Sequence, residues 1–208
     1  MVTRAILGGF VGLLLAWPAA GHENHAHSPP KPAAEAMQVP ANVPFPVAID
    51  GRYALIDQDG VPRTQADFHG GYALIFFGYA NCRGICSVAL PRIAAALDSL
   101  GTDGTAVQPI LITVDPINDT PAAMKAALPK IHPRLMGLTG DEPALSAART
   151  AFQVKSKQLF VDRNGQPVFA HGGFIYLMGR NGELLTVMPP VLSPERMAEL
   201  VRRYMAAG

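Results

Sequence analysis

The fold of this chain is decided by residues 76–86, FFGYANCRGIC, which contain its only two cysteines, Cys82 and Cys86. Upstream, residues 72–77 form a short apolar run between glycines, which is typical of a buried strand. Downstream, apolar residues recur at intervals of three and four, as on one face of a helix: Leu90, Ile93, Leu97 and Leu100. We therefore expect the cysteines on a turn between a strand and a helix.

This position favours a reactive cysteine, because the free N–H groups at the start of a helix stabilise the thiolate relative to the thiol. A thiolate is both a nucleophile and a metal ligand. If the segment that carries Cys86 is already helical, its spacing from Cys82 puts both sulfurs on one face. The pair is then suited to a disulfide or to a shared metal ion, and the spacing alone does not choose between them.

Composition indicates a globular protein. The chain has 208 residues, of which 49% are hydrophobic and 16% are charged, and its formal net charge is +1. This length is sufficient for one ordinary domain and a leader. No basic excess favours nucleic acid, so we expect no nucleic-acid partner.

Residues 1–21 are predicted to be a signal peptide, because Arg4 precedes an apolar run that ends in small residues. The alternative is an uncleaved membrane anchor, but the run is shorter than the roughly 20 apolar residues of a membrane span. Export would place the protein in the bacterial periplasm or cell envelope, where a disulfide can persist. An uncleaved leader would attach it to the membrane.

Residues 22–43 are predicted to be a flexible linker rich in proline, alanine and histidine. Three histidines in it, His22, His25 and His27, are interpreted as a solvated tail rather than as a metal site. The folded domain is expected over residues 44–208. It should open with a hairpin whose turn is Asp59-Gly60.

The centre of the chain predicts an α/β sheet. A second β-branched run, residues 110–114, follows the helix after the cysteines, and this order favours parallel strands joined by a crossover. Pro91 should make that helix begin late or kink. Next, Asp119 or Thr120 is expected to cap a helix that starts at Pro121. Asp115 is interpreted as structural, the alternative being a site residue at the carboxyl end of a strand.

The last part of the chain predicts two hairpins, with turns at Asn164-Gly165 and Asn181-Gly182. A final helix should begin after Ser193. We expect His69 to be a solvated loop residue and His132 a turn residue.

His171 is a candidate third ligand, because it stands before the last hairpin with two glycines after it that should let the backbone approach closely. In a thioredoxin-like α/β fold, that loop packs beside the cysteine turn. Two thiolates and one imidazole suit Cu(I), which accepts three soft ligands. A structural zinc site would need a fourth ligand, and none is evident. We therefore expect Cys82, Cys86 and His171 to bind copper.

Four segments together resemble the Sco/SenC copper-binding proteins: FFGYANCRGIC at 76–86, TVDPINDTP at 113–121, HPRLMGLTG at 132–140 and HGGFIYLMGRNGEL at 171–184. The resemblance covers most of the chain beyond the linker. It implies a thioredoxin-like α/β fold, with a central mixed sheet flanked by helices and an N-terminal β-hairpin extension.

The resemblance also implies copper, as Cu(I) and also Cu(II), bound at Cys82, Cys86 and His171. It implies a copper chaperone for the copper centre of cytochrome c oxidase. The expected partner is cytochrome c oxidase subunit II or another exported copper protein.

Three positions depart from the family pattern. Arg83 and Ser87 replace the prolines that commonly follow the cysteines, and Ala170 replaces an acidic residue before the histidine. We expect Arg83 to lower a thiol pKa through its positive charge. The missing carboxylate at Ala170 is expected to remove a partner that would orient the histidine ring.

The alternative function is a thiol:disulfide oxidoreductase, in which Cys82, the more exposed thiolate, attacks and Cys86 resolves. Three residues separate the cysteines, whereas thioredoxin-type reductants have two, so the spacing favours copper. A peroxidase is less favoured, because the usual threonine-proline context is missing. Whether the protein is an enzyme stays open, and the two activities are compatible, because only the reduced pair can bind copper.

Overall fold

The computed structural model describes residues 49–208. The predicted leader at 1–21, the linker at 22–43 and the tail histidines His22, His25 and His27 lie outside the described residues. Within residues 49–208, no helix has the length and apolar character needed to cross a membrane.

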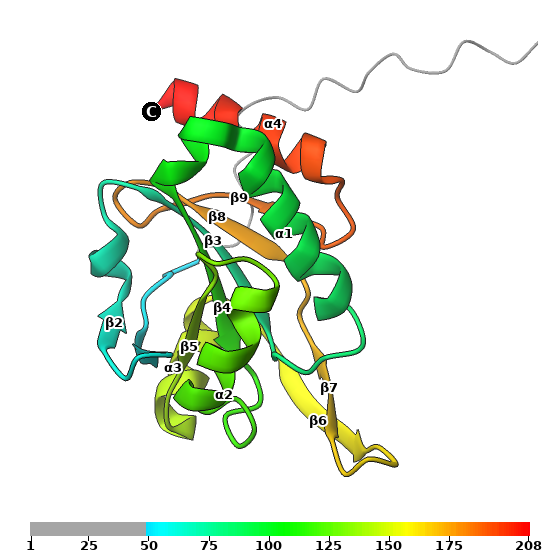
Figure 1. Cartoon of the computed structure of the whole chain (residues 1–208). Helices are drawn as coiled ribbons and strands as arrows, with labels where there is room; N and C mark the ends of the chain where they lie inside the picture. Colours follow the sequence, from blue (N-terminus) through cyan, green and yellow to red (C-terminus); the bar gives the residue numbers. More distant parts are fainter. Residues whose placement is uncertain (1–48) are drawn as a thin grey trace, which may run out of the picture. The chain divides into compact units, whose positions relative to one another are not determined.

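A seven-stranded mixed sheet forms the centre of the fold, in the order β2-β1-β5-β4-β3-β8-β9. Its three middle strands are parallel: β3 (Tyr72–Gly78), β4 (Val107–Thr113) and β5 (Met136–Thr139). All seven residues of β3 are buried, as expected for a strand covered on both faces. The predicted parallel crossover after the cysteines is confirmed, and Figure 1 shows β3 and β4 side by side.

Antiparallel hairpins extend the sheet on both sides. On one side, β1 (Ala54–Asp57) pairs with β5 and with β2 (Pro62–Thr64), which confirms the introductory hairpin. On the other side, β8 (Ile175–Met178) pairs with β3 and with β9 (Leu184–Met188). The turn of this second hairpin contains Gly182 with a φ of +80°, which glycine adopts readily.

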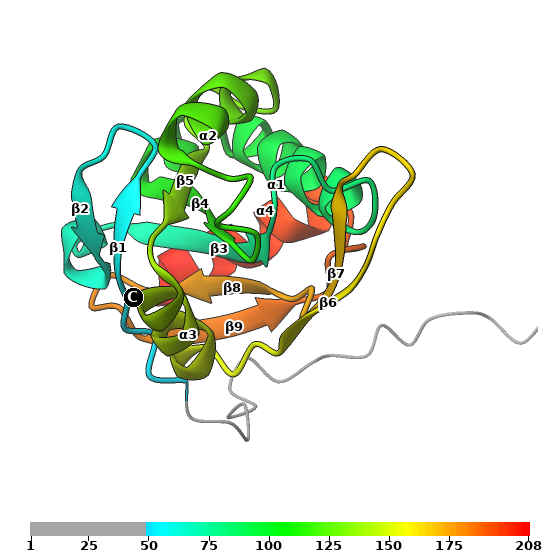
Figure 2. The same ribbon diagram turned by 90° about the horizontal axis from the view of Figure 1, so that it is seen from below.

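Helices cover both faces of the sheet (Figure 2). The structure contains α1 (Cys86–Leu100), α2 (Pro121–Ala127), α3 (Glu142–Ala151) and α4 (Pro194–Ala207), and short 3-10 turns at Gln65–Phe68, Gly101–Ala106 and Leu128–Lys130. Successive β3 residues point to opposite faces. Gly78 therefore faces Cys86 at the start of α1, whereas Phe77 contacts Phe152 just beyond α3. Ser193 caps α4, as the sequence predicts.

Of the two effects expected of Pro91, the late start is wrong, because α1 begins at Cys86 and contains Pro91, and the kink stays a prediction. A proline inside a helix leaves one carbonyl without its N–H donor. For Pro91 that carbonyl belongs to Ser87, in the exposed first turn of the helix, where water can satisfy it. The proline is therefore tolerated.

Strands β6 (Ser156–Val161) and β7 (Pro167–His171) form a separate two-stranded antiparallel sheet, which we call the ribbon. Its turn contains the predicted Asn164-Gly165, and Gly165 has a φ of +76°. The ribbon projects from the rest of the fold at the lower right of Figure 1. His171 is its last residue, so only residues 172–174 separate the ribbon from β8.

Candidate metal centre

The cysteine turn joins the end of β3 to the start of α1. Gly78 ends the strand, and the Cys82 N–H donates to the Tyr79 carbonyl oxygen at 3.2 Å. Cys82 precedes the helix, whereas Cys86 lies in its first turn. Both sulfurs therefore meet through the shape of this turn, not through a helix that contains both cysteines.

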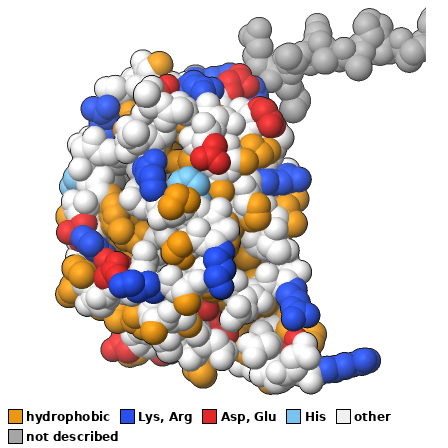
Figure 3. Space-filling view, in the orientation of Figure 1, with side chains coloured by type: hydrophobic (Ala, Val, Ile, Leu, Met, Phe, Trp, Pro, Cys, Tyr) orange, Lys and Arg blue, Asp and Glu red, His pale blue; other side chains and the backbone are white. Residues whose placement is uncertain are grey.

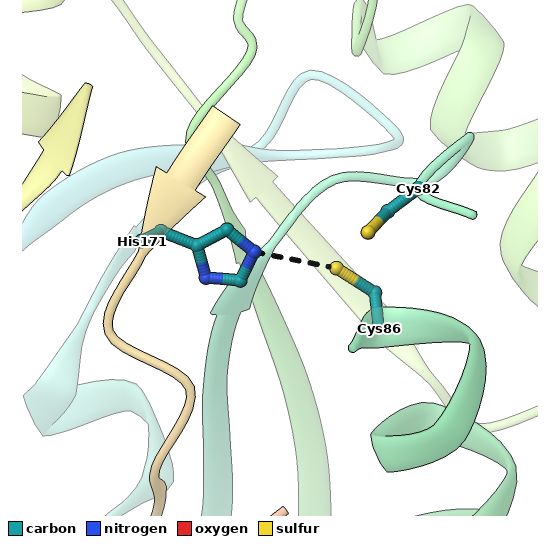
Figure 4. Close-up of side chains that lie close together, drawn as sticks. All are labelled: Cys82, Cys86 and His171. Carbon is teal, nitrogen blue, oxygen red and sulfur yellow. Dashed lines mark hydrogen bonds between the residues drawn. The ribbon is translucent and has the colours of Figure 1, made fainter. Parts of the chain in front are cut away.

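His171 comes to the same place from β7. Its Nε2 lies 3.6 Å from the Cys86 Sγ, although the two residues are 85 positions apart in the chain. One ligand atom from each of Cys82, Cys86 and His171 lies within 4.8 Å of the others. Figure 4 shows the three side chains converging from the turn, the helix start and the strand. The structure thus brings together the three residues that the sequence predicts as ligands.

The ring of His171 is oriented by its neighbour. Its Nδ1 lies 3.1 Å from the Gly172 carbonyl oxygen. A carbonyl oxygen only accepts, so this contact assigns the proton to Nδ1. Nε2 is then left with a free lone pair that faces the sulfurs, which is the form that a metal-binding imidazole needs.

The two thiols have opposite pKa shifts. Hydrogen bonding from the Cys86 side chain lowers the pKa of Cys82, and His171 and the Gly84 N–H act in the same direction against burial. The shared hydrogen bond and burial raise the pKa of Cys86. Cys82 therefore ionises first, and it is also the more exposed of the two, as expected.

Gly78 leaves the space that Cys86 occupies. A Cβ at this position would lie 2.8 Å from the Cys86 Sγ and 2.8 Å from the Phe76 ring. The sequence indicates Gly78 only as the end of a strand. A glycine two positions after Phe76 on the same strand face is the signal that could have indicated the close approach.

Replacing Gly78 by alanine is expected to weaken Cu(I) binding and to destabilise the fold by about 1–3 kcal/mol, because the new methyl group overlaps Cys86 and Phe76. The matched control is Gly84→Ala, whose Cβ would lie at an ordinary 3.7 Å from the Cys82 Sγ. Urea unfolding and an anaerobic Cu(I) competition titration measure both effects. Equal behaviour of the two variants would contradict the role of Gly78.

Asp119 joins the cysteine turn to β4. Its carboxylate accepts from the Ala80 N–H at 3.0 Å and from the Thr113 hydroxyl at 2.7 Å, and only 1% of the residue is exposed. The cap of α2 is Thr120, whose Oγ1 accepts from the Ala123 N–H. Of the two predicted caps Thr120 is therefore correct, and Asp119 instead positions the backbone that precedes Cys82.

Burial raises the pKa of Asp119 to about 6, against the opposing hydrogen bonds from Thr113 and Ala80. A carboxyl with a higher pKa in the folded state stabilises the fold below its unfolded pKa of 3.8, and this contribution is lost as the pH rises through about 6. Asp119→Asn removes the titration. We expect the unfolding free energy of the wild type to fall relative to Asp119→Asn between pH 4 and 6, by at most about 1.4 kcal/mol per pH unit. Urea unfolding across this range measures it, and a constant difference would be evidence against the shift.

The remaining candidates stay outside the centre. Asp115 is buried and accepts from the Asn118 side chain at 2.8 Å, within its own turn. His132 is mostly buried, and its Nδ1 accepts from the Arg134 N–H, as expected of a turn residue. His69 is an exposed loop residue. The structural interpretations of Asp115, His132 and His69 therefore agree with their observed contacts.

Ala170 stands directly before His171, where the family pattern has an acidic residue. Neighbouring residues on a strand point to opposite faces, and Ala170 pairs across the ribbon with Lys157. A carboxylate at position 170 would face Lys157, whereas the Gly172 carbonyl orients the histidine ring. The Gly172 carbonyl supplies the orienting contact in this chain, and the effect of Ala170 on copper binding stays a prediction.

The other departures also have local roles. Ser87 donates to the Gly84 carbonyl oxygen at 2.6 Å and so closes the turn. Arg83 is exposed. The pKa of Asp162 is lowered first by the Gln166 N–H, and the positive charge of Arg83 contributes in the same direction. Arg83 thus acts on the ribbon turn, and its expected effect on a thiol pKa stays a prediction.

The two glycines after His171, Gly172 and Gly173, lie where a Cβ atom would also fit. A Cβ at Gly172 would lie 3.6 Å from Val154, and one at Gly173 would lie 3.6 Å from Ile85 and from Pro190. These are ordinary van der Waals distances. The expectation that the glycines permit a close backbone approach is therefore wrong.

Tyr79 is a site residue that sequence reasoning missed. Its ring centroid lies 5.5 Å from that of Phe169, so Tyr79 joins the cysteine turn to β7. Burial, followed by the charge of Cys82, raises its pKa to about 12. Its ring centroid lies 6.2 Å from that of His171. Position 79, between the strand and Cys82, is the only local signal.

A cleft of about 450 Å³ opens beside the centre. It is lined on one side by the cysteine turn, including Cys82 and Arg83, and on the other by β7 and the ribbon turn, including His171 and Asp162. The cleft gives a partner access to Cys82 and His171, while Cys86 is 1% exposed. Exchange of a bound ligand is therefore expected through Cys82 and His171.

The fold and the site define a thioredoxin-like α/β protein that places a histidine beside two cysteines on a strand-to-helix turn. The sequence model described as SCO1/SenC matches residues 42–206. The chain belongs to the SCO1/SenC family.

Known proteins agree with this assignment. The mouse mitochondrial protein SCO2 homolog is 34% identical over 76% of this chain and 62% of its own length. The chain thus spans less than two thirds of that relative. The structure of Bradyrhizobium japonicum ScoI with copper bound is 36% identical, with a TM-score of 0.69 over 76% of this chain and 99% of that chain. Yeast Sco1 with copper bound is 27% identical, with a TM-score of 0.71 over 78% and 91%.

Proposed function

We propose that this protein is a copper chaperone that binds copper through Cys82, Cys86 and His171 and delivers it for assembly of the copper centre of cytochrome c oxidase. The observation that carries the proposal is the convergence of these three ligand atoms within 4.8 Å. Copper-bound relatives of the same fold support it.

The donor set fits copper better than zinc. Two sulfurs and one imidazole are soft ligands of the kind that Cu(I) prefers, and Cu(I) accepts three of them. A structural zinc site would be closed by a fourth protein ligand. In residues 49–208, the cluster contains three His, Cys or carboxylate residues and no fourth. The imidazole also suits Cu(II), so we include both oxidation states.

Location and partner are part of the proposal. The predicted leader supports export to the periplasm or cell envelope. We propose subunit II of cytochrome c oxidase, or another exported copper protein, as the recipient. An uncleaved leader would keep the chaperone at the membrane.

A thiol:disulfide oxidoreductase is the second candidate function, and the opposite pKa shifts favour it. Cys82 ionises first and is partly exposed, as an attacking thiolate must be, whereas Cys86 is buried behind it. The two functions are linked, because forming the disulfide removes two electrons and two protons from the thiols that would bind copper.

The test compares copper binding before and after oxidation of the pair. Reduced protein is expected to bind one equivalent of Cu(I) tightly in an anaerobic competition titration, and protein oxidised to the disulfide is expected to lose this site. A variant with His22, His25 and His27 changed to alanine serves as the control for copper held by the tail. Equal affinity in both redox states would defeat the three-ligand site.

A further inference from the structure

The ribbon exposes apolar side chains next to the metal centre. Leu159, Phe160 and Val161 are 55%, 57% and 55% exposed. Phe160 pairs with Val168 and Val161 pairs with Pro167, so these two residues point to opposite faces, and Leu159 lies at an irregularity of the register. Both faces of the ribbon therefore carry uncovered apolar surface. A two-stranded sheet with exposed apolar side chains tends to associate with other protein surfaces, so such side chains indicate an interaction surface.

The pairing register defines one face of the ribbon. Cross-strand partners share a face, so four residues form what we call the outer ribbon face: Lys157, Ala170, Phe160 and Val168. Phe169 and His171 lie on the opposite face, where their rings contact Tyr79. The outer ribbon face is therefore apolar at Phe160 and Val168, and basic at Lys157.

The charges around this face are mostly positive. Lys157 and Arg163 on the ribbon are exposed, and so are Lys155 just before β6 and Arg83 on the cysteine turn. Asp162 is the one acidic residue of the ribbon, and it already accepts from backbone N–H groups of its own turn. Figure 3 shows Lys or Arg side chains and hydrophobic side chains together at the projecting end of the ribbon.

We infer that the outer ribbon face and Arg83 dock a protein domain that presents an apolar patch ringed by carboxylates beside its own metal-accepting thiols. This inference rests on the proposed function. Val168 and Ala170 of the outer ribbon face line the cleft together with Cys82 and Arg83, so a domain docked on that face lies at the exit of the metal centre. Phe160 would pack into the apolar patch of the partner domain, while Lys157 and Arg83 would attract the carboxylates around that patch.

The test measures binding of the copper-loaded full chain to the reduced, metal-free soluble domain of cytochrome c oxidase subunit II from the same organism. Lys157→Glu is expected to slow association about tenfold at low ionic strength, with a smaller effect in high salt. Phe160→Ser is expected to raise the dissociation constant about tenfold. Lys130→Glu is the matched control, because Lys130 is exposed and lies outside the ribbon.

Copper titration and urea unfolding of the same variants separate the two hypotheses. Both ribbon variants should keep the wild-type Cu(I) affinity and unfolding midpoint, because neither residue belongs to the centre. Wild-type binding by both variants, or no binding of the domain by the wild type, would overturn the docking inference. Failure of the wild type to bind copper would instead overturn the proposed function.

Discussion

Cys86→Ser is expected to lower the Cu(I) affinity of the reduced protein by more than about 100-fold. Losing a residue that only hydrogen-bonds to a metal ligand costs about 10- to 100-fold, and here a ligand itself is lost. The change replaces a soft sulfur with a hard oxygen, which Cu(I) binds poorly. Cys86 is 1% exposed and faces the His171 Nε2 at 3.6 Å. The serine hydroxyl can donate to the same nitrogen, so we expect the fold to be retained.

An anaerobic competition titration measures this loss, and thermal unfolding establishes that the variant is folded. Ser99→Ala is a suitable control, because Ser99 is exposed and lies in the same helix. Copper affinity near the wild-type value in folded Cys86→Ser would show that the buried thiol is not a ligand.

His171→Ala is expected to lower the Cu(I) affinity by about 100-fold and to weaken Cu(II) binding further, since imidazole suits Cu(II). Cys82 and Cys86 remain in this variant, so it tests the third ligand alone. The absorption and electron paramagnetic resonance spectra of the Cu(II) form should also change, because a nitrogen ligand is lost. These spectra report on the metal directly and do not depend on stability.

His69→Ala is the matched control, because it removes an exposed loop histidine outside the centre. The result also separates the two candidate functions. An oxidoreductase needs only the cysteine pair, so unchanged copper binding with retained disulfide exchange in His171→Ala would favour thiol redox chemistry.

Local sequence pattern was sufficient for most of the fold. The apolar run at 72–77, the Asn164-Gly165 and Asn181-Gly182 turns and the Ser193 cap each predicted an element that the structure contains. Each of these elements depends on residues that are close together in the sequence, so a short segment is enough to predict it. Pro91 is an exception, because α1 begins before it at Cys86 and the carbonyl that it leaves unpaired lies in the exposed first turn.

The sequence identified the residues of the candidate site, but local pattern alone could not predict that they converge. Cys82 and Cys86 were placed on a strand-to-helix turn from the sequence, and His171 was selected as the third ligand through the expected fold and the family resemblance. Their convergence depends on β8 pairing with β3, which brings the end of β7 to the cysteine turn. No short window of sequence contains that pairing.

The sequence by itself determined most of the secondary structure, the three hairpins and the soft donor set of this protein. The tertiary structure alone decided that Gly78 makes room for Cys86, that Asp119 supports the backbone before Cys82, and that the Gly172 carbonyl orients His171. These facts depend on register and burial between distant segments. A residue's partners across a sheet are set by how whole strands align, and packing of the common core fixes that alignment.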